Sequence, residues 1–264
     1  MLPAAGLNGH SHRQAPTPRP TILCFSHLRW NFVYQRPQHL MTRAAANARV
    51  YFLEEPLQTE AREPSLRVED QPEGVQVLTP ILPHGYSIAQ AIDAQRALLD
   101  QWLLDAGIVD FIAWYYTPMA LLFTSHLAPA ATVYDCMDQL SAFQGAPPEL
   151  VKLEQELFAR ADVVFTGGRS LFAEKRGLHP NVHLFPSSVD RAHFAASRLP
   201  HEDPEDQASI PHPRIGFFGV LDERLNRELI ATVAACEPAW QLIFVGPVVK
   251  IREDELPRAA NIHY

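Results

Sequence analysis

Side chains able to bind an oxygen-rich ligand are most concentrated directly after the apolar run at residues 21–25. Residues 26 to 39 carry hydroxyl, imidazole, guanidinium, indole, phenol and amide groups: Ser26, His27, Arg29, Trp30, Tyr34, Gln35, Arg36, Gln38 and His39. These groups can form several hydrogen bonds to hydroxyl or phosphate oxygens. The sequence therefore predicts a ligand-binding loop. The alternative is a polar surface loop with Trp30 and Tyr34 packed into the core.

The elements on either side of this loop would hold it at the edge of a sheet. Residues 21–25 are typical of a buried strand. Pro37 predicts the start of a helix, because its fixed φ and missing N–H suit the first helical turn. In an open α/β sheet, the loop that leaves the carboxyl end of a strand faces the ligand crevice.

Carboxylates occupy the corresponding position after a second apolar run, at residues 131–136. Asp135, Asp138 and Ser141 lie at or just beyond its end. Carboxylates at the end of a central strand can hold a sugar hydroxyl or attract a cation. The alternative is equally open, because Asp and Ser also favour turns and helix starts.

Glycines follow three further apolar runs. Gly167 and Gly168 come after residues 162–166, with Arg169 next to them as a charge for a phosphate. Gly219 lies near the end of the run 214–220, and Gly246 lies near the end of the run 241–247. Glycine there allows main-chain N–H groups to approach an anion, and a helix start favours negative charge. The competing interpretation for the first pair is a tight turn.

Arg224 is the best charged candidate for a diphosphate near Gly219, and the alternative is a charge pair at the start of a helix. The dinucleotide fingerprint G-x-G-x-x-G is missing from the sequence. So are a nucleophile elbow, a phosphate-binding loop, a metal-binding histidine pair and an Asp-x-Asp motif. No metal site is therefore predicted.

Short β-rich runs alternate with helical patterns, which predicts parallel βαβ units and a doubly wound sheet. We expect strands at residues 21–25, 50–54, 75–79, 110–115, 131–135, 162–166 and 181–185, and helices at 37–46, 88–105, 118–127, 148–160 and 170–176. The pattern breaks in the proline- and acid-rich segment 195–213, read as a linker. It resumes with strands at 214–220 and 241–247 and a helix at 225–236.

These patterns predict a disordered tail at 1–20, a first domain at 21–194, the linker at 195–213 and a partial second domain at 214–264. The run 181–194, with its Pro186, is at least as consistent with a hinge edge as with ligand contact. Only 51 residues follow Pro213, too few to close a doubly wound domain around its own core. We therefore expect the second domain to be truncated.

Composition excludes several classes of protein. Hydrophobic residues make up 47% of the 264 and charged residues 20%, enough for a substantial core. The net charge of −8 argues against sequence-independent nucleic-acid binding. Three cysteines offer no disulfide framework or zinc spacing, which favours the reducing cytoplasm. No signal peptide or bilayer-spanning segment is visible.

The motifs taken together resemble the bacterial group-1 (family four) glycosyltransferases, which have two facing Rossmann-like domains, the GT-B fold. Within this family, the sequence most resembles a subgroup related to proteins fused or adjacent to UDP-galactopyranose mutase. The resemblance covers nearly all of residues 21–264. The segments that carry it are FSHLRWNFVYQRPQHL, VYDCMDQLSAF, FTGGRSLFAEKR, HLFPSSVDRAHF, RIGFFGVLDERLN and LIFVGPVVKI.

The resemblance implies an acceptor-binding first domain and a second domain that binds a nucleotide sugar, with retention of configuration and no essential metal or other cofactor. Ser26 to Trp30 would line the interdomain cleft, and Gly219 would lie near the diphosphate. Two departures weaken the match. An arginine is common after that glycine, where this chain has Val220, and the family's paired-glutamate donor motif is missing.

We therefore expect a glycosyltransferase whose acceptor is a glycan or lipid-linked, with the chain as given weak or inactive. His27, Arg29 and Asp138 are the candidate catalytic residues. The donor-binding candidates are Ser26, Gly167, Gly168, Arg169, Gly219, Arg224 and Gly246. A cytoplasmic location is expected, with peripheral attachment to the inner membrane left open. The alternatives are a non-catalytic acceptor-binding or assembly module and a sugar-nucleotide epimerase of the same fold.

Overall fold

The structure of the chain, a computed structural model, describes residues 19–200 and 202–264. It divides into two compact units, Met1–Val189 and Asp190–Tyr264. Of the tail expected at residues 1–20, all but the last two residues lie outside the described part. Residues 190–194, which the sequence assigned to the first domain, group with the second unit. The boundaries of the domains and of the linker stay a prediction.

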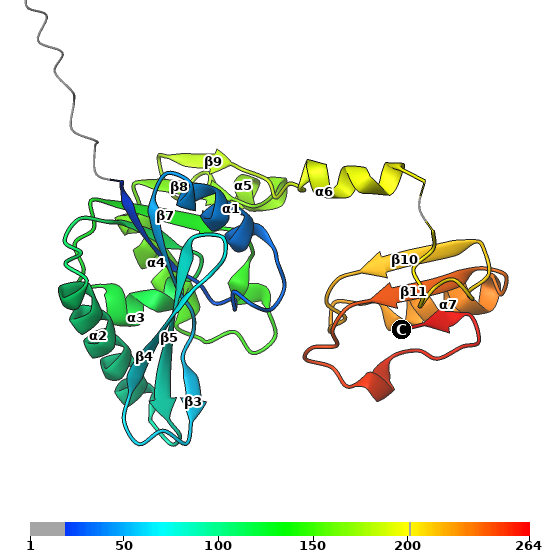
Figure 1. Cartoon of the computed structure of the whole chain (residues 1–264), viewed down its shortest axis with the longest axis horizontal. Coiled ribbons are helices and arrows are strands. Elements are labelled where there is room, and N and C mark those ends of the chain that lie inside the picture. The colour runs from blue at the N-terminus through cyan, green and yellow to red at the C-terminus, as the bar shows by residue number, and fades with distance from the viewer. Residues whose placement is uncertain (1–18, 201) are drawn as a thin grey trace, which may run out of the picture. The chain divides into compact units, whose positions relative to one another are not determined.

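A nine-stranded sheet forms the centre of the first unit (Figure 1). Its order is β3-β5-β2-β1-β6-β7-β8-β9, with β4 paired to β5. Every pairing is parallel except that of β4 with β5. The strands are β1 (Thr21–Phe25), β2 (Arg49–Leu53), β3 (Leu57–Thr59), β4 (Ser65–Asp70), β5 (Val75–Pro83), β6 (Ile112–Tyr115), β7 (Ala131–Cys136), β8 (Val163–Thr166) and β9 (Val182–Leu184).

Helices cover both faces of this sheet, as the alternation of side chains along β1 requires. Ile22 and Cys24 pack in one core with Met41 of α1 (Arg36–Ala45). Leu23 and Phe25 pack in the other, with residues of α2 (Ile88–Asp105) and α4 (Leu150–Arg160). The doubly wound arrangement expected from the sequence is therefore confirmed. The remaining elements are η1 (Pro118–Ala120), α3 (Leu121–Thr124), η2 (Leu140–Ala142) and α5 (Arg169–Lys175).

The sequence missed two strands and overestimated one helix. β3 and β4 were not foreseen: β3 has only three residues, and in β4 the apolar alternation is limited to Leu66 and Val68 on a largely exposed strand. They lie beside the long strand β5, with which β4 forms an antiparallel ribbon (Figure 1). The helix expected at 118–127 is only a 3-10 turn followed by α3, one turn long. Pro129 lies shortly beyond, where a longer helix could not continue.

The second unit is a three-stranded parallel sheet with a small core. Its strands are β10 (Arg214–Phe218), β11 (Gln241–Val245) and β12 (Ile262–His263), in that order. Its helical elements are α6 (Arg191–Ala195), η3 (Ala196–Arg198), α7 (Arg227–Cys236) and η4 (Glu253–Glu255). Asn261 ties α7 to the sheet, because its amide donates to the carbonyls of Ala234, Glu237 and Trp240 at 3.1, 3.3 and 2.9 Å.

Candidate functional site

The loop after β1 is anchored by hydrogen bonds to the carboxylate of Glu54, the residue that follows β2. Its Oε1 accepts the main-chain N–H of Trp30 at 2.6 Å, and its Oε2 accepts from Arg29 Nη1 at 3.1 Å. Oε2 also accepts from Thr79 Oγ1 at 3.2 Å. Glu54 is 6% exposed, so these hydrogen bonds are shielded from water and hold the loop firmly. Because β1 and β2 are paired, Glu54 lies directly beside the start of the loop.

Gln38 of α1 holds the same loop from within. Its side-chain amide is fully buried and donates to the carbonyls of Arg29, Trp30 and Val33 at 3.2, 3.1 and 2.9 Å. Its Oε1 accepts the N–H of Gln35 at 3.2 Å. One side chain therefore satisfies main-chain groups from four positions of the loop, which would otherwise need water.

His27 is an uncharged imidazole in this structure. Burial lowers its pKa from 6.5 to about 4, against the opposing effect of a hydrogen bond with the main chain of Tyr116. Its Nδ1 is buried and has no hydrogen-bond partner among the described residues. At neutral pH His27 therefore brings no positive charge to the loop. Ser26 beside it accepts the N–H of Leu28 with its hydroxyl oxygen at 3.0 Å.

Arg29 is bound to the protein. Besides Glu54, its guanidinium donates to the carbonyls of Glu55 and Pro56, the latter at 3.1 Å. Its side chain is 33% exposed. Arg29 was expected to position substrate oxygens, but in this arrangement the carboxylate of Glu54 neutralises much of its charge and its first role is to shape the loop.

Arg36 and Asp135 form a buried ion pair beneath the loop. Arg36 Nη2 lies 2.8 Å from Asp135 Oδ1, and Arg36 Nε lies 3.0 and 3.1 Å from the two carboxylate oxygens. The two side chains are 4% and 0% exposed. Burial raises the pKa of Asp135, against the opposing effect of Arg36. Arg36 also donates to the carbonyl of Phe185 and lies 5.3 Å from the centroid of its ring.

The carboxyl ends of β1, β7 and β8 bring several predicted site residues to one edge of the sheet. Ser26, Asp138 and Gly167 each lie just beyond one of these strands. The three strands are parallel, and β6 lies between β1 and β7. Asp138 is half-buried there. Gly168 precedes α5, and Arg169 is its exposed first residue.

Gly167 is required by packing. A β-carbon at this position would lie 2.6 Å from the carbonyl oxygen of Met137, whereas one at Gly168 would meet nothing within 4 Å. The N–H of Gly167 donates to the carbonyl of Cys136 at 2.9 Å. This N–H is therefore already used within the sheet, which favours the tight-turn interpretation for Gly167.

In the second unit, Gly219 and Gly246 follow the paired strands β10 and β11 and cross in direct contact. Their φ angles are 147° and 150°, in the region that favours glycine. A β-carbon at Gly246 would lie 1.8 Å from the carbonyl oxygen of Gly219. The N–H of Gly219 donates to the carbonyl of Val245 at 2.9 Å. The crossing brings main chain to the sheet edge, but this N–H is already paired.

Arg224 forms a fork-like ion pair with Asp222. Arg224 Nε lies 3.0 Å from both carboxylate oxygens, and Nη2 lies 2.7 Å from Oδ2. The arginine lowers the pKa of Asp222. The Arg224 side chain is 60% exposed against 9% for Asp222. Arg224 is thus an exposed guanidinium oriented by Asp222 just before α7, where the side chain of Asn226 accepts the N–H of Leu229.

The predicted residues fall into two sets, one in each unit. Glu54 was missed, although a carboxylate directly after an apolar strand was available as a signal. Glu55 was missed as well. So was a cavity beside the loop, because the residues that line it come from four separate stretches of the sequence, 25–26, 53–58, 86–95 and 117–123. The described residues contain no cluster of three or more His, Cys, Asp or Glu side chains that could hold a metal ion. In the same part of the chain, no helix combines the length and apolar character needed to cross a membrane.

No protein-family model matches this sequence, and no curated protein matches it. Solved structures match its fold. Sucrose-phosphate synthase from Thermosynechococcus elongatus has a TM-score of 0.57 at 14% identity, over 89% of this chain and 64% of its own. The alpha,alpha-trehalose-phosphate synthase (UDP-forming) from Burkholderia xenovorans, in complex with glucose-6-phosphate, has a TM-score of 0.53 at 13% identity, over 89% and 66%.

A third structure, trehalose-6-phosphate from E. coli bound with UDP-2-fluoro glucose, has a TM-score of 0.54 at 11% identity, over 87% of this chain and 65% of the other. This chain therefore spans less than two thirds of the length of each of these three structures. At such identities the likeness shows the fold. The α/β fold with Rossmann-like units, of the GT-B type, is confirmed.

Proposed function

We propose that this chain forms the acceptor side and part of the donor side of a glycosyltransferase, which moves a sugar from a nucleotide sugar to a hydroxyl acceptor. One observation carries the proposal: in a GT-B-type fold, the clamped loop after β1 and the residues after β7 and β8 share one sheet edge. Ligands of open α/β sheets bind outside the carboxyl ends of the strands. One similar structure is bound with UDP-2-fluoro glucose and another is a UDP-forming synthase, which supports a nucleotide-sugar donor.

The residues would divide the work between charge and positioning. Arg224, oriented by Asp222, would neutralise the diphosphate as it leaves, which is the largest electrostatic demand of the reaction. Neutral His27 would exchange a hydrogen bond with the acceptor or the transferred sugar, and Asp138 would bind a hydroxyl at the same edge. Preorganisation of the loop by Glu54 and Gln38 lowers the cost of holding these groups in place.

The finer assignments rest on the sequence resemblance. We propose transfer with retention of configuration and without an essential metal, and membership of the subgroup related to proteins fused or adjacent to UDP-galactopyranose mutase. An acceptor that is a glycan or lipid-linked follows from the same resemblance. The absence of an Asp-x-Asp motif supports the metal-independent route.

Titration of the full chain with UDP-glucose and GDP-mannose by calorimetry tests the donor assignment. We expect Arg224→Gln to raise the Kd of the preferred donor at least ~10-fold, because a charge-assisted hydrogen bond contributes about 1.5–3 kcal/mol. Arg252→Gln is the matched control. Arg252 also pairs with an aspartate two residues away, Asp254 at 2.8 Å, and is exposed. We expect no change of Kd in this variant.

Two results would contradict the proposal. Equal losses in both arginine variants would mean that only general charge matters. Isomerisation of the UDP-sugar without any acceptor would favour an epimerase of the same fold. Transfer of labelled sugar to an added hydroxyl acceptor, with NMR of the anomeric product, would test retention.

A further inference from the structure

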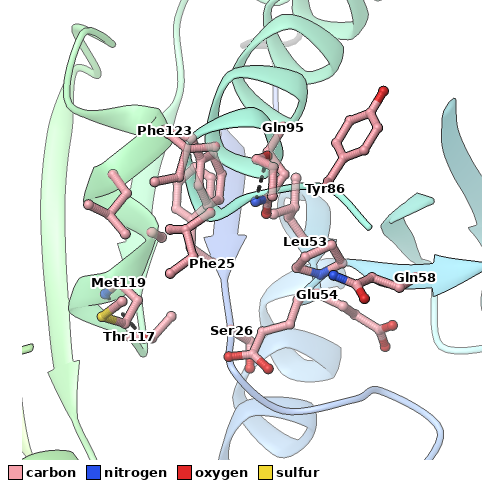
Figure 2. Close-up of a pocket in the computed structure, with 17 residues that line it drawn as sticks. Phe25, Ser26, Leu53, Glu54, Gln58, Tyr86, Gln95, Thr117, Met119 and Phe123 are labelled. Atoms are coloured by element: carbon pink, nitrogen blue, oxygen red, sulfur yellow. Dashed lines mark hydrogen bonds between the residues drawn. The ribbon is translucent and has the colours of Figure 1, made fainter. Parts of the chain in front are cut away.

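A cavity of about 360 Å³ opens in the first unit beside the loop that follows β1. It lies between the ends of β1 and β2, the first half of α2, and η1 with α3 (Figure 2). Its volume lies within the range of about 300–1,000 Å³ that small-molecule sites occupy. All of its lining residues belong to the first unit, so the cavity is complete without the second.

The floor of the cavity is apolar and preformed. It is lined by Phe25, Leu53, Ile92, Met119, Leu122 and Phe123. Phe25 is fully buried, stacks on Tyr115 with ring centroids 4.8 Å apart, and meets Phe123 edge-on at 6.3 Å. Because these rings belong to the main core, the floor exists without a ligand and suits an aromatic or aliphatic group.

The rim is polar and its only charges are negative. Ser26, Glu54, Glu55 and Gln58 lie on one side, and none of the lining residues is Lys, Arg or His. Figure 2 shows the carboxylate of Glu54 beside Ser26 and away from Phe123. The nearby cation, Arg29, is already bound to Glu54 and to two carbonyls. A phosphate at this rim would meet the exposed carboxylate of Glu55 and no free positive charge, because Glu54 and Arg29 neutralise each other; this is unfavourable.

We propose that this cavity binds the acceptor, and that the acceptor is an uncharged, hydroxyl-bearing molecule whose apolar or aromatic part fills the floor. The inference rests on the proposed glycosyltransferase function. It distinguishes this chain from the similar structure that holds glucose-6-phosphate, since a sugar phosphate does not suit this rim. Sugar hydroxyls suit the rim, because a carboxylate accepts their hydrogen bonds and a side-chain amide both accepts and donates them.

Methyl NMR of the full chain, labelled at the methionine methyl groups, tests the proposal directly. Met119 lines the cavity, whereas Met41 is fully buried in the core on the other face of the sheet. We expect phenyl β-glucoside to shift the Met119 signal saturably and to leave Met41 unchanged. Glucose 6-phosphate should shift neither signal. Met119→Leu identifies the resonance.

Two variants separate binding in the cavity from binding elsewhere. Ala91→Trp fills the cavity from α2 and should raise the Kd for phenyl β-glucoside at least ~10-fold, which corresponds to about 1.4 kcal/mol. Ala97→Trp is the control, because Ala97 is exposed on the same helix and does not line the cavity. Glu55→Lys, at an exposed rim position, should allow glucose 6-phosphate to shift Met119.

The proposal would be overturned by glucose 6-phosphate shifting Met119 in the unaltered chain at a lower Kd than the glucoside. It would equally be overturned by the absence of a saturable glucoside response up to ~10 mM, a concentration at which sites of millimolar affinity fill. Failure of the donor titration would instead contradict the glycosyltransferase. In that case, a Met119 response to the glucoside would still support the inference that the cavity binds an uncharged sugar derivative in preference to a sugar phosphate.

Discussion

Removing only one charge of the buried pair Arg36 and Asp135 should lower the free energy of unfolding far more than removing both charges together. In Asp135→Asn, Arg36 keeps its charge, 4% exposed, without the carboxylate 2.8 Å away. Their attraction is about 6 kcal/mol at an effective dielectric of ~20, and breaking such a pair costs about 3–5 kcal/mol. We expect the first unit to lose that much free energy of unfolding in Asp135→Asn, and a similar amount in Arg36→Met.

The double variant Arg36→Met/Asp135→Leu should recover most of this loss, because neither charge then has to be removed from water. About 1 kcal/mol should remain lost, since the carbonyl of Phe185 no longer has its donor. A double-mutant cycle measured by urea unfolding gives the coupling free energy. Trp30, Trp102 and Trp114 lie in the first unit, so a Trp240→Phe background makes tryptophan fluorescence report that unit alone. A loss below about 1 kcal/mol in Asp135→Asn, or a double variant as unstable as the sum of the singles, would refute the reasoning.

Three further predictions concern His27 and the glycines. Because the pKa of His27 falls to about 4 in the folded chain, its contribution to stability is complete above its unfolded pKa of 6.5 and is lost as the pH falls toward 4. His27→Asn should flatten the pH dependence of urea unfolding in that window, by at most about 3 kcal/mol, and an NMR titration midpoint near 6.5 in the folded protein would contradict this. Gly167→Ala should destabilise the first unit by about 1–3 kcal/mol, because its β-carbon meets main chain at 2.6 Å, and Gly168→Ala should cost under about 1 kcal/mol; equal costs in urea unfolding would refute the packing argument. Gly246→Ala should cost more than about 3 kcal/mol, because its β-carbon would lie 1.8 Å from the carbonyl oxygen of Gly219 and its φ of 150° is unfavourable; it should expose the second unit to limited proteolysis, whereas Gly216→Ala, with open space around it, should leave digestion unchanged.

Sequence reasoning located the fold because the relevant signals are local. Buried strands such as 21–25 and 131–136 are mostly apolar, and α2 has an apolar stripe that faces the core. Parallel topology then places the carboxyl ends of β1, β7 and β8 on one edge. The strand β4 was missed because its alternation is limited to Leu66 and Val68, and its place depends mainly on pairing with β5.

The site was less predictable because its chemistry depends on partners distant in the sequence. Arg29 looked like a free cation, but Glu54, 25 residues away, binds it. Gly219 looked like an anion-binding N–H, but that group is paired to Val245. No local pattern states which polar groups are already satisfied within the fold, and that is what decides which remain for a ligand.

The way in which the loop after β1 is anchored has a consequence for how related proteins could diverge. Glu54 accepts from a main-chain N–H, and Gln38 donates to three main-chain carbonyls. Because these hydrogen bonds are made to main-chain groups, they depend on the path of the chain and not on the side chains along it. The exposed residues Phe32 and Tyr34 can therefore change in related proteins while the conformation of the segment stays the same.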